Sequence, residues 1–222
     1  MESGDRSSGV DVSFDDNARV VRASAWIADV HWNEGAPDCK LTPQDPLQVH
    51  TYEPQTFILR QSPCANFEAN FLYLLVGSDK VLLIDTGAVA DLKEMPLAKT
   101  ILELLPGRDD KKLPLLAAHT HRHLDHPAGD PQFASLPSVQ VVPIDLDKVR
   151  AFFGFTNWPN GIAHVDLGGR TVDVIPTPGH NETHDLIRPK RLRPSLSHES
   201  PLRDHAAFYR HSGRAFLQAP AK

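Results

Sequence analysis

The chain has 222 residues and a formal net charge of −5, and 41% of its residues are hydrophobic and 23% charged. These values are typical of one globular domain with a sizeable core. The acidic chain carries no basic stripe over its body, so we expect no nucleic-acid partner. No run of about 20 apolar residues occurs, so we expect no membrane span and no membrane partner.

The N-terminal residues 1–20 are polar, and they lack a basic start followed by an apolar stretch. They do not resemble a signal peptide, so we interpret them as a disordered leader and predict a cytoplasmic protein. Cys39 and Cys64 lack metal-ligand spacing. Without an export signal we predict two free thiols, with a disulfide between them as the alternative.

Residues 21–54 show no clear periodicity, so their structure stays open. Apolar runs of strand length then occupy residues 56–61, 70–76 and 80–85, and the turn residues 77–79 join the last two as a hairpin. Apolar residues at helical spacing predict a helix over 96–105, which ends at Pro106 and Gly107.

Further along the chain, residues 113–119 form the next apolar run and predict a buried strand. Asp130 is predicted to cap a short helix, and Asp145 to cap a helix that ends at Phe153. The remaining predicted elements are a strand at 139–142 and a hairpin of 162–167 with 170–175 over Gly168 and Gly169.

The heptapeptide Thr120–His126 follows the predicted strand and contains three imidazoles and one carboxylate. Ordinary folding gains nothing from such a cluster, because a core would have to desolvate it. Imidazole and carboxylate are ligands of divalent zinc, iron and manganese. The heptapeptide therefore predicts a metal site, with a polar loop of chance histidines as the alternative.

The spacing of these residues suggests two metal positions. His121 and His123 are two apart, so on extended backbone they point to the same side and can bind one ion. Asp125 and His126 follow after a turn and can reach a second ion about 3.5–4 Å away, as in binuclear hydrolases. His119 precedes the cluster on the predicted buried strand, and we interpret it as a bystander.

Three segments in order resemble the metallo-β-lactamase superfamily. The heptapeptide resembles its T-H-x-H-x-D-H signature. Upstream, residues 70–76 and 80–87 resemble its opening hairpin and a strand that ends in Asp-Thr-Gly. Downstream, residues 174–180 resemble a strand that leads to Thr-Pro-Gly-His. The resemblance covers residues 56–184.

The resemblance implies an α+β fold, the αβ/βα four-layer sandwich, in which two mixed β-sheets pack face to face with helices outside. It also implies roles for seven residues. The first metal would be bound by His121, His123 and His180, and the second by Asp125 and His126. Asp125 would also position the attacking hydroxide and so act in catalysis. Asp85 would orient a ligand imidazole as a supporting carboxylate, and His184 would contact the substrate, support the ligands or have no role in the site.

By this resemblance the protein is a hydrolase that uses one or two zinc ions, with iron or manganese as alternatives. Hydroxide generated at the metal would attack the carbonyl of a small-molecule ester, thioester, lactone or lactam. One alternative is a catalytically impaired metal-binding protein that retains the fold. Another is a mononuclear iron oxidoreductase of the same fold, similar to the persulfide dioxygenases. The oligomeric state stays open.

The C-terminal part departs from the family pattern. From Leu186 to the end there are eight Lys and Arg and two Asp and Glu, and 186–204 is rich in Arg, Pro and Ser. We expect no core strand there. Residues 205–218 resemble the family's next hairpin, but Gln218 stands near the position of its Gly-Asp. We therefore expect a domain over 21–185, an inserted or altered segment over 186–204 and a remnant hairpin within 205–222. The fold would be incomplete at the C-terminus, without the family's bridging Asp and final His.

Overall fold

The computed structural model describes residues 30–107, 112–189, 209–211 and 214–216. Its larger sheet consists of six strands in sequential order. They are β1 (Leu47–Glu53), β2 (Thr56–Gln61), β3 (Phe71–Val76), β4 (Val81–Ile84), β5 (Leu115–Ala118) and β6 (Val139–Val141). The first four strands pair antiparallel, and β4, β5 and β6 pair parallel. The sheet is therefore mixed.

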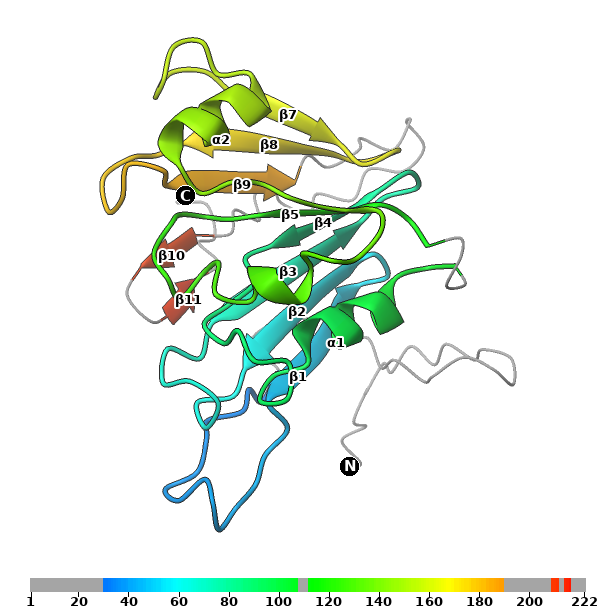
Figure 1. Ribbon diagram of the computed structural model, residues 1–222, viewed down its shortest axis with the longest axis vertical. Helices are drawn as coiled ribbons and strands as arrows, with labels where there is room; N and C mark the ends of the chain where they lie inside the picture. The colour runs from blue at the N-terminus through cyan, green and yellow to red at the C-terminus, as the bar shows by residue number, and fades with distance from the viewer. Residues whose placement is uncertain (1–29, 108–111, 190–208, 212–213, 217–222) are drawn as a thin grey trace, which may run out of the picture.

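The second sheet has three antiparallel strands in the order β7 (Ala163–Asp166), β8 (Thr171–Pro176) and β9 (Asp185–Pro189). Two helices, α1 (Leu97–Leu104) and α2 (Leu146–Phe153), and a short 3-10 turn, η2 (Asp130–Gln132), lie between the strands of the chain. Figure 1 shows the β7–β9 sheet beside the larger sheet and α1 along the larger sheet.

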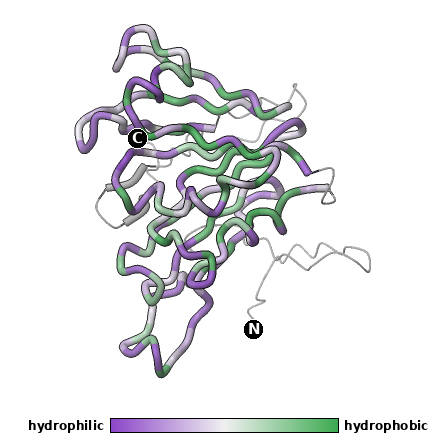
Figure 2. Tube along the Cα trace, viewed as in Figure 1, coloured by the Kyte–Doolittle hydropathy of each residue, from purple (hydrophilic) through white to green (hydrophobic). Residues whose placement is uncertain are grey.

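The larger sheet is covered on both faces, and the alternation of its side chains produces two cores. On β4, Val81 and Leu83 belong to a cluster that contains the buried side of α1, whereas Leu82 and Ile84 belong to a cluster shared with the second sheet. All four residues are buried. A strand covered on both faces needs no polar alternation, which explains its continuous apolar sequence. Figure 2 shows the hydrophobic segments gathered in these central strands.

Most predicted elements are confirmed within one or two residues at each end. The strand predicted at 56–61 has those bounds, and the 96–105 helix forms over 97–104. The open segment 21–54 contains β1, whose polar and half-buried residues gave no clear alternation. Near the C-terminus, β10 (Tyr209–His211) and β11 (Arg214–Phe216) pair antiparallel, within the predicted remnant hairpin.

Three expectations need correction. The segment 186–204 was expected to hold no core strand, but β9 includes its first four residues, because Ile187 supplies an apolar side chain that the second core buries. Asp130 does not cap its helix, since Gly129 holds the cap position and the Asp130 carboxylate is bound elsewhere. Asp145 holds its cap position without a capping bond, and its carboxylate lies 3.0 Å from Lys148 Nζ.

The prediction of two free thiols is wrong. Cys39 and Cys64 form a disulfide, and their Cα atoms are 5.5 Å apart. No short sequence pattern connects the two cysteines, because they are 25 residues apart in the chain, with β1 and β2 between them. The bond connects the segment before β1 to the loop between β2 and β3.

Several expectations lie outside the described residues. These are the leader at 1–20, the segment from 190 to 204, and Gln218 with the residues that follow it. Within the described ranges, none of the helices has both the length and the apolar character needed to cross a bilayer.

Candidate metal centre

The predicted ligands lie at one edge of the larger sheet. Because β4 and β5 run parallel, their carboxyl ends meet at the same edge. Asp85 directly follows β4, and Thr120–His126 begins two residues after β5. Such edges are the usual location of ligand sites in open α/β sheets. The loop that follows β8 brings His180 to this edge from the second sheet.

Three imidazoles converge there. The candidate ligand atoms of His121, His123 and His180 all lie within 4.8 Å of one another. His121 Nε2 and His123 Nδ1 are 3.1 Å apart, and the His180 ring centroid lies 4.7 Å from that of His123. Tetrahedral zinc with bonds of about 2.0–2.1 Å holds its ligand nitrogens roughly 3.3 Å apart. The trio is therefore close enough together for all three rings to bind one divalent ion.

The protonation of His121 also suits a metal ligand. Burial, with a further contribution from the neighbouring His126, lowers the pKa of His121 to about 3. The imidazole is therefore neutral at physiological pH, and a neutral ring keeps the lone pair that a metal needs.

Asp125 and His126 lie beside the trio but are not part of it. The ring centroids of His121 and His126 are 3.9 Å apart, and His126 Nε2 lies 3.2 Å from Asp125 Oδ2. Within the described residues, neither Asp125 nor His126 belongs to a comparably close group of three candidate ligands. The structure therefore brings the two second-metal candidates together without assembling a complete second set.

His126 and Asp125 interact as a charged, hydrogen-bonded pair. Burial lowers the pKa of His126, but the carboxylates of Asp85 and Asp125 outweigh burial and raise it to about 9. The hydrogen bond from His126 lowers the pKa of Asp125 well below its usual range. The protonated His126 ring therefore provides the positive charge beside Asp125. A metal ion at this position would have to displace the proton of His126.

Asp85 orients this pair. Its backbone has a φ of 63°, in the left-handed region that Asp tolerates better than most residues. Its carboxylate accepts hydrogen bonds from Thr120 N at 2.8 Å and from His126 Nδ1 at 2.8 Å. Burial raises the pKa of Asp85, but His126 outweighs burial and the pKa is lowered. Because Asp85 holds Nδ1 of His126, Nε2 is the nitrogen that faces Asp125.

His184 lies behind the trio. Its ring centroid is 5.6 Å from that of His121, and its Nδ1 is 2.7 Å from Thr177 Oγ1 and 3.1 Å from the Thr177 carbonyl. The carbonyl can only accept, so Nδ1 carries the hydrogen. Burial lowers the pKa of His184, which keeps the ring neutral.

The sequence prediction missed several supporting residues. Thr120 Oγ1 bonds to Asp85 Oδ2 at 2.9 Å and lies within 3.2 Å of ring nitrogens of two histidines. Asn70 donates to the Asp125 carbonyl. Thr120 is the first residue of the ligand heptapeptide, and Asn70 directly precedes the apolar strand β3. These positions were the signal that the sequence contained. His119 is outside the ligand group and bonds to Asp130 at 2.9 Å.

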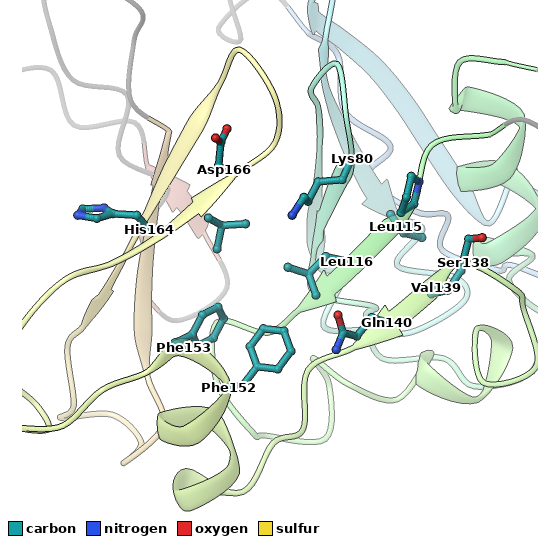
Figure 3. Close-up of a pocket in the computed structure, with 12 residues that line it drawn as sticks. Lys80, Leu115, Leu116, Ser138, Val139, Gln140, Phe152, Phe153, His164 and Asp166 are labelled. Atoms are coloured by element: carbon teal, nitrogen blue, oxygen red, sulfur yellow. The ribbon is translucent and has the colours of Figure 1, made fainter.

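A groove lies at the amino ends of β4 and β5, opposite the ends that carry the predicted ligands. This groove of about 560 Å³ is lined by Lys80, which precedes β4, and by Phe152 and Phe153 of α2. Figure 3 shows Lys80 pointing into the gap between β7 and β5, above the two phenylalanines. Since the predicted metal residues follow the other ends of β4 and β5, the groove is separate from the imidazole cluster.

A comparison with protein families identifies the superfamily of this chain. The model of the metallo-beta-lactamase superfamily matches residues 66–190, which is more than half of the chain. The chain therefore belongs to the metallo-beta-lactamase superfamily, and the predicted fold class is confirmed. None of the curated proteins matches the chain.

Similar solved structures include two lactamases. A metallo-beta-lactamase of Cronobacter sakazakii is 18% identical with a TM-score of 0.47, over 65% of this chain and 58% of that one. A subclass B3 metallo-beta-lactamase of Bradyrhizobium japonicum is 17% identical with a TM-score of 0.47, over 71% and 62%. A variant of the flavo di-iron protein of Thermotoga maritima is 17% identical with a TM-score of 0.45, over 64% and 39%. The chain thus spans less than two thirds of each of these structures.

Proposed function

We propose that this protein is a metal-dependent hydrolase that cleaves a small-molecule ester, thioester, lactone or lactam. The observation that carries the proposal is the convergence of His121, His123 and His180, from two different sheets, within 4.8 Å. A zinc ion held by these three imidazoles would lower the pKa of a water molecule and polarise the carbonyl of the substrate. Iron and manganese are alternative metals, because they accept the same ligand types.

The chain's own residues have distinct roles in this proposal. The imidazoles of the trio bind the first ion. Asp125 and His126 bind a second ion, and Asp125 orients the attacking water through its carboxylate. Asp85 fixes the His126 ring through Nδ1, because an acceptor on one ring nitrogen directs the other toward the metal. His184 keeps a neutral ring next to His121 and contacts the substrate or supports the trio.

Metal analysis and hydrolysis assays test the proposal. Protein purified without chelator is expected to contain at least one equivalent of zinc, and the double variant H121A/H123A should lose both metal and turnover. The variant H31A is the matched control, because His31 is an exposed histidine outside the cluster. Substrates are a panel of lactones, thioesters and a chromogenic β-lactam.

The competing functions correspond to other outcomes of the same experiment. Bound metal without turnover on any substrate would favour the impaired metal-binding protein. One equivalent of iron with oxygen-dependent turnover would favour the mononuclear oxidoreductase. Unchanged turnover in the H121A/H123A variant would contradict the proposed chemistry.

The disulfide also bears on the compartment. Reducing compartments keep thiols reduced, so a structural disulfide is typical of exported proteins. We therefore propose that the chain matures in an oxidising compartment rather than in the cytoplasm that its sequence suggested. Alkylation of free thiols in freshly lysed source cells tests this, because Cys39 and Cys64 should react only after reduction. Immediate labelling of both would restore the cytoplasmic assignment.

A further inference from the structure

Asn70 connects the start of β3 to the metal-binding loop. Its side chain is fully buried, and its Nδ2 donates to the main-chain carbonyl of Asp125 and lies 3.4 Å from Asp125 Oδ2. Both partners are acceptors, so the NH₂ end of the amide must face Asp125. This contact bridges 55 residues of sequence.

The oxygen end of the Asn70 amide makes no hydrogen bond that would favour asparagine at this position. Asn70 Oδ1 is buried and has no hydrogen-bond partner within the described residues. A buried acceptor without a partner lowers stability, and an apolar side chain of similar size would avoid that loss. Packing therefore does not explain an asparagine at this position, whereas its donor toward Asp125 does.

The loop that carries Asn70 is itself fixed. Ala65 N and Asn66 N both donate to the Ser62 carbonyl, Ala69 N donates to Asn66 O, and Cys64 is held by the disulfide. Asn70 O accepts from Gln61 N at 2.9 Å. The loop therefore holds the Asn70 Nδ2 donor in a fixed position relative to Asp125. A rigid donor of this kind is needed to orient a metal ligand.

We propose that Asn70 is a positioning residue that orients the Asp125 carboxylate for the second metal. The inference rests on the proposed function, because it presumes that Asp125 binds an ion. Donors that hold a ligand carboxylate typically change metal affinity about 10–100-fold when they are removed. Loss of Asn70 should therefore lower the affinity for the second ion by that factor. The affinity for the first ion, which the imidazole trio binds, should not change.

The variant N70L separates positioning from folding. Leucine has nearly the shape of asparagine but lacks the donor, and it also removes the unpartnered Oδ1. The midpoint of urea unfolding of the metal-free protein should therefore stay nearly unchanged, because removal of the unpartnered Oδ1 offsets the loss of the bond to the Asp125 carbonyl. A purely structural role for Asn70 predicts a lower midpoint instead. N70A, which leaves space instead of apolar surface, is the second variant if N70L does not fold.

Zinc titration of the metal-free full-length protein against a competing chelator tests the proposal. The wild type should bind two equivalents, and N70L should retain the first step and lose 10–100-fold in the second. N66A is the matched control, because Asn66 caps the same loop through Glu68 N without contacting Asp125. In the D125A background, N70L should cause no further loss.

The outcomes distinguish this inference from the proposed function. If N70L binds both ions as the wild type does, or if both steps weaken together with a lower unfolding midpoint, Asn70 is not a positioning residue. A wild type that binds a single ion through the trio also overturns the inference but leaves the hydrolase proposal standing. A wild type that binds no metal overturns the proposed function itself.

Discussion

Asp185 is predicted to make the stability of this protein depend on pH. This residue begins β9 and is 3% exposed, and its Oδ1 is buried without a hydrogen-bond partner in the described part of the chain. Burial raises the pKa of Asp185 to about 7, from an ordinary value of 3.8 for this side chain. The variant D185N keeps the shape of the side chain and removes its charge at every pH.

The size of the effect follows from the shift in pKa. Below pH 4 the carboxyl is protonated in both the folded and the unfolded chain, so it has no effect. Between pH 4 and 7 the unfolded chain loses the proton while the folded chain retains it, so stability falls as pH rises. Each pKa unit corresponds to about 1.4 kcal/mol, which gives a total of about 4 kcal/mol as an upper estimate.

Urea unfolding of the wild type and D185N, in chelator and from pH 4 to pH 8.5, measures this effect. The difference in unfolding free energy between the two proteins should move by about 2–4 kcal/mol in favour of D185N as pH rises. Subtracting the unfolding free energy of the wild type from that of D185N at each pH cancels the contributions of the other titrating groups. D147N is the control, since the Asp147 side chain is 93% exposed. A difference that stays constant from pH 4 to pH 8.5 would refute the reasoning.

Three further outcomes are expected. Replacing Cys39 and Cys64 by serine should lower the unfolding free energy by about 3.5 kcal/mol, because the disulfide closes 25 residues, and an unchanged urea midpoint would contradict this. G77A should destabilise by about 2 kcal/mol or more, since a Cβ there would lie 2.0 Å from the Leu167 carbonyl oxygen; wild-type stability in urea would show that the hairpins can separate. The second zinc step should strengthen about tenfold per pH unit between pH 6 and 8, because the ion must displace a proton from His126, whose pKa is raised to about 9. Chelator-competition titrations measure this, and a pH-independent second step would argue against His126 as a ligand.

Local patterns in the sequence predicted the parts of the fold that depend on local chemistry. The continuous apolar runs of β3, β4 and β5 are recognisable because both faces of these strands are buried. The metal loop is recognisable because its candidate ligands follow one another within seven residues. In both cases the information lies within a short window, so sequence reading and structure agree.

The parts that were missed depend on contacts between distant segments. Asn70 and Asp125 are 55 residues apart, and Cys39 and Cys64 are 25 residues apart, and no short pattern connects either pair. β1 was missed because its residues alternate too weakly between buried and exposed positions. Tertiary packing, rather than local propensity, decides these features.

The imidazole trio exists only if the two sheets dock, because His121 and His123 follow β5 whereas His180 follows β8. Besides the contacts between the histidine rings, a hydrogen bond and an ion pair connect these loops: Asp185 N donates to the Thr120 carbonyl at 2.8 Å, and Arg122 lies 2.7 Å from Glu182. The ion pair is half-exposed, so it contributes about 0–1 kcal/mol at most. The apolar cluster that contains Leu82 and Val172 therefore supplies most of the docking energy. Since an ion at the trio would bind only the docked arrangement, a free metal concentration 1,000 times the Kd would add about 4 kcal/mol to that docking. Metal binding and the packing of the two sheets are thus one coupled equilibrium.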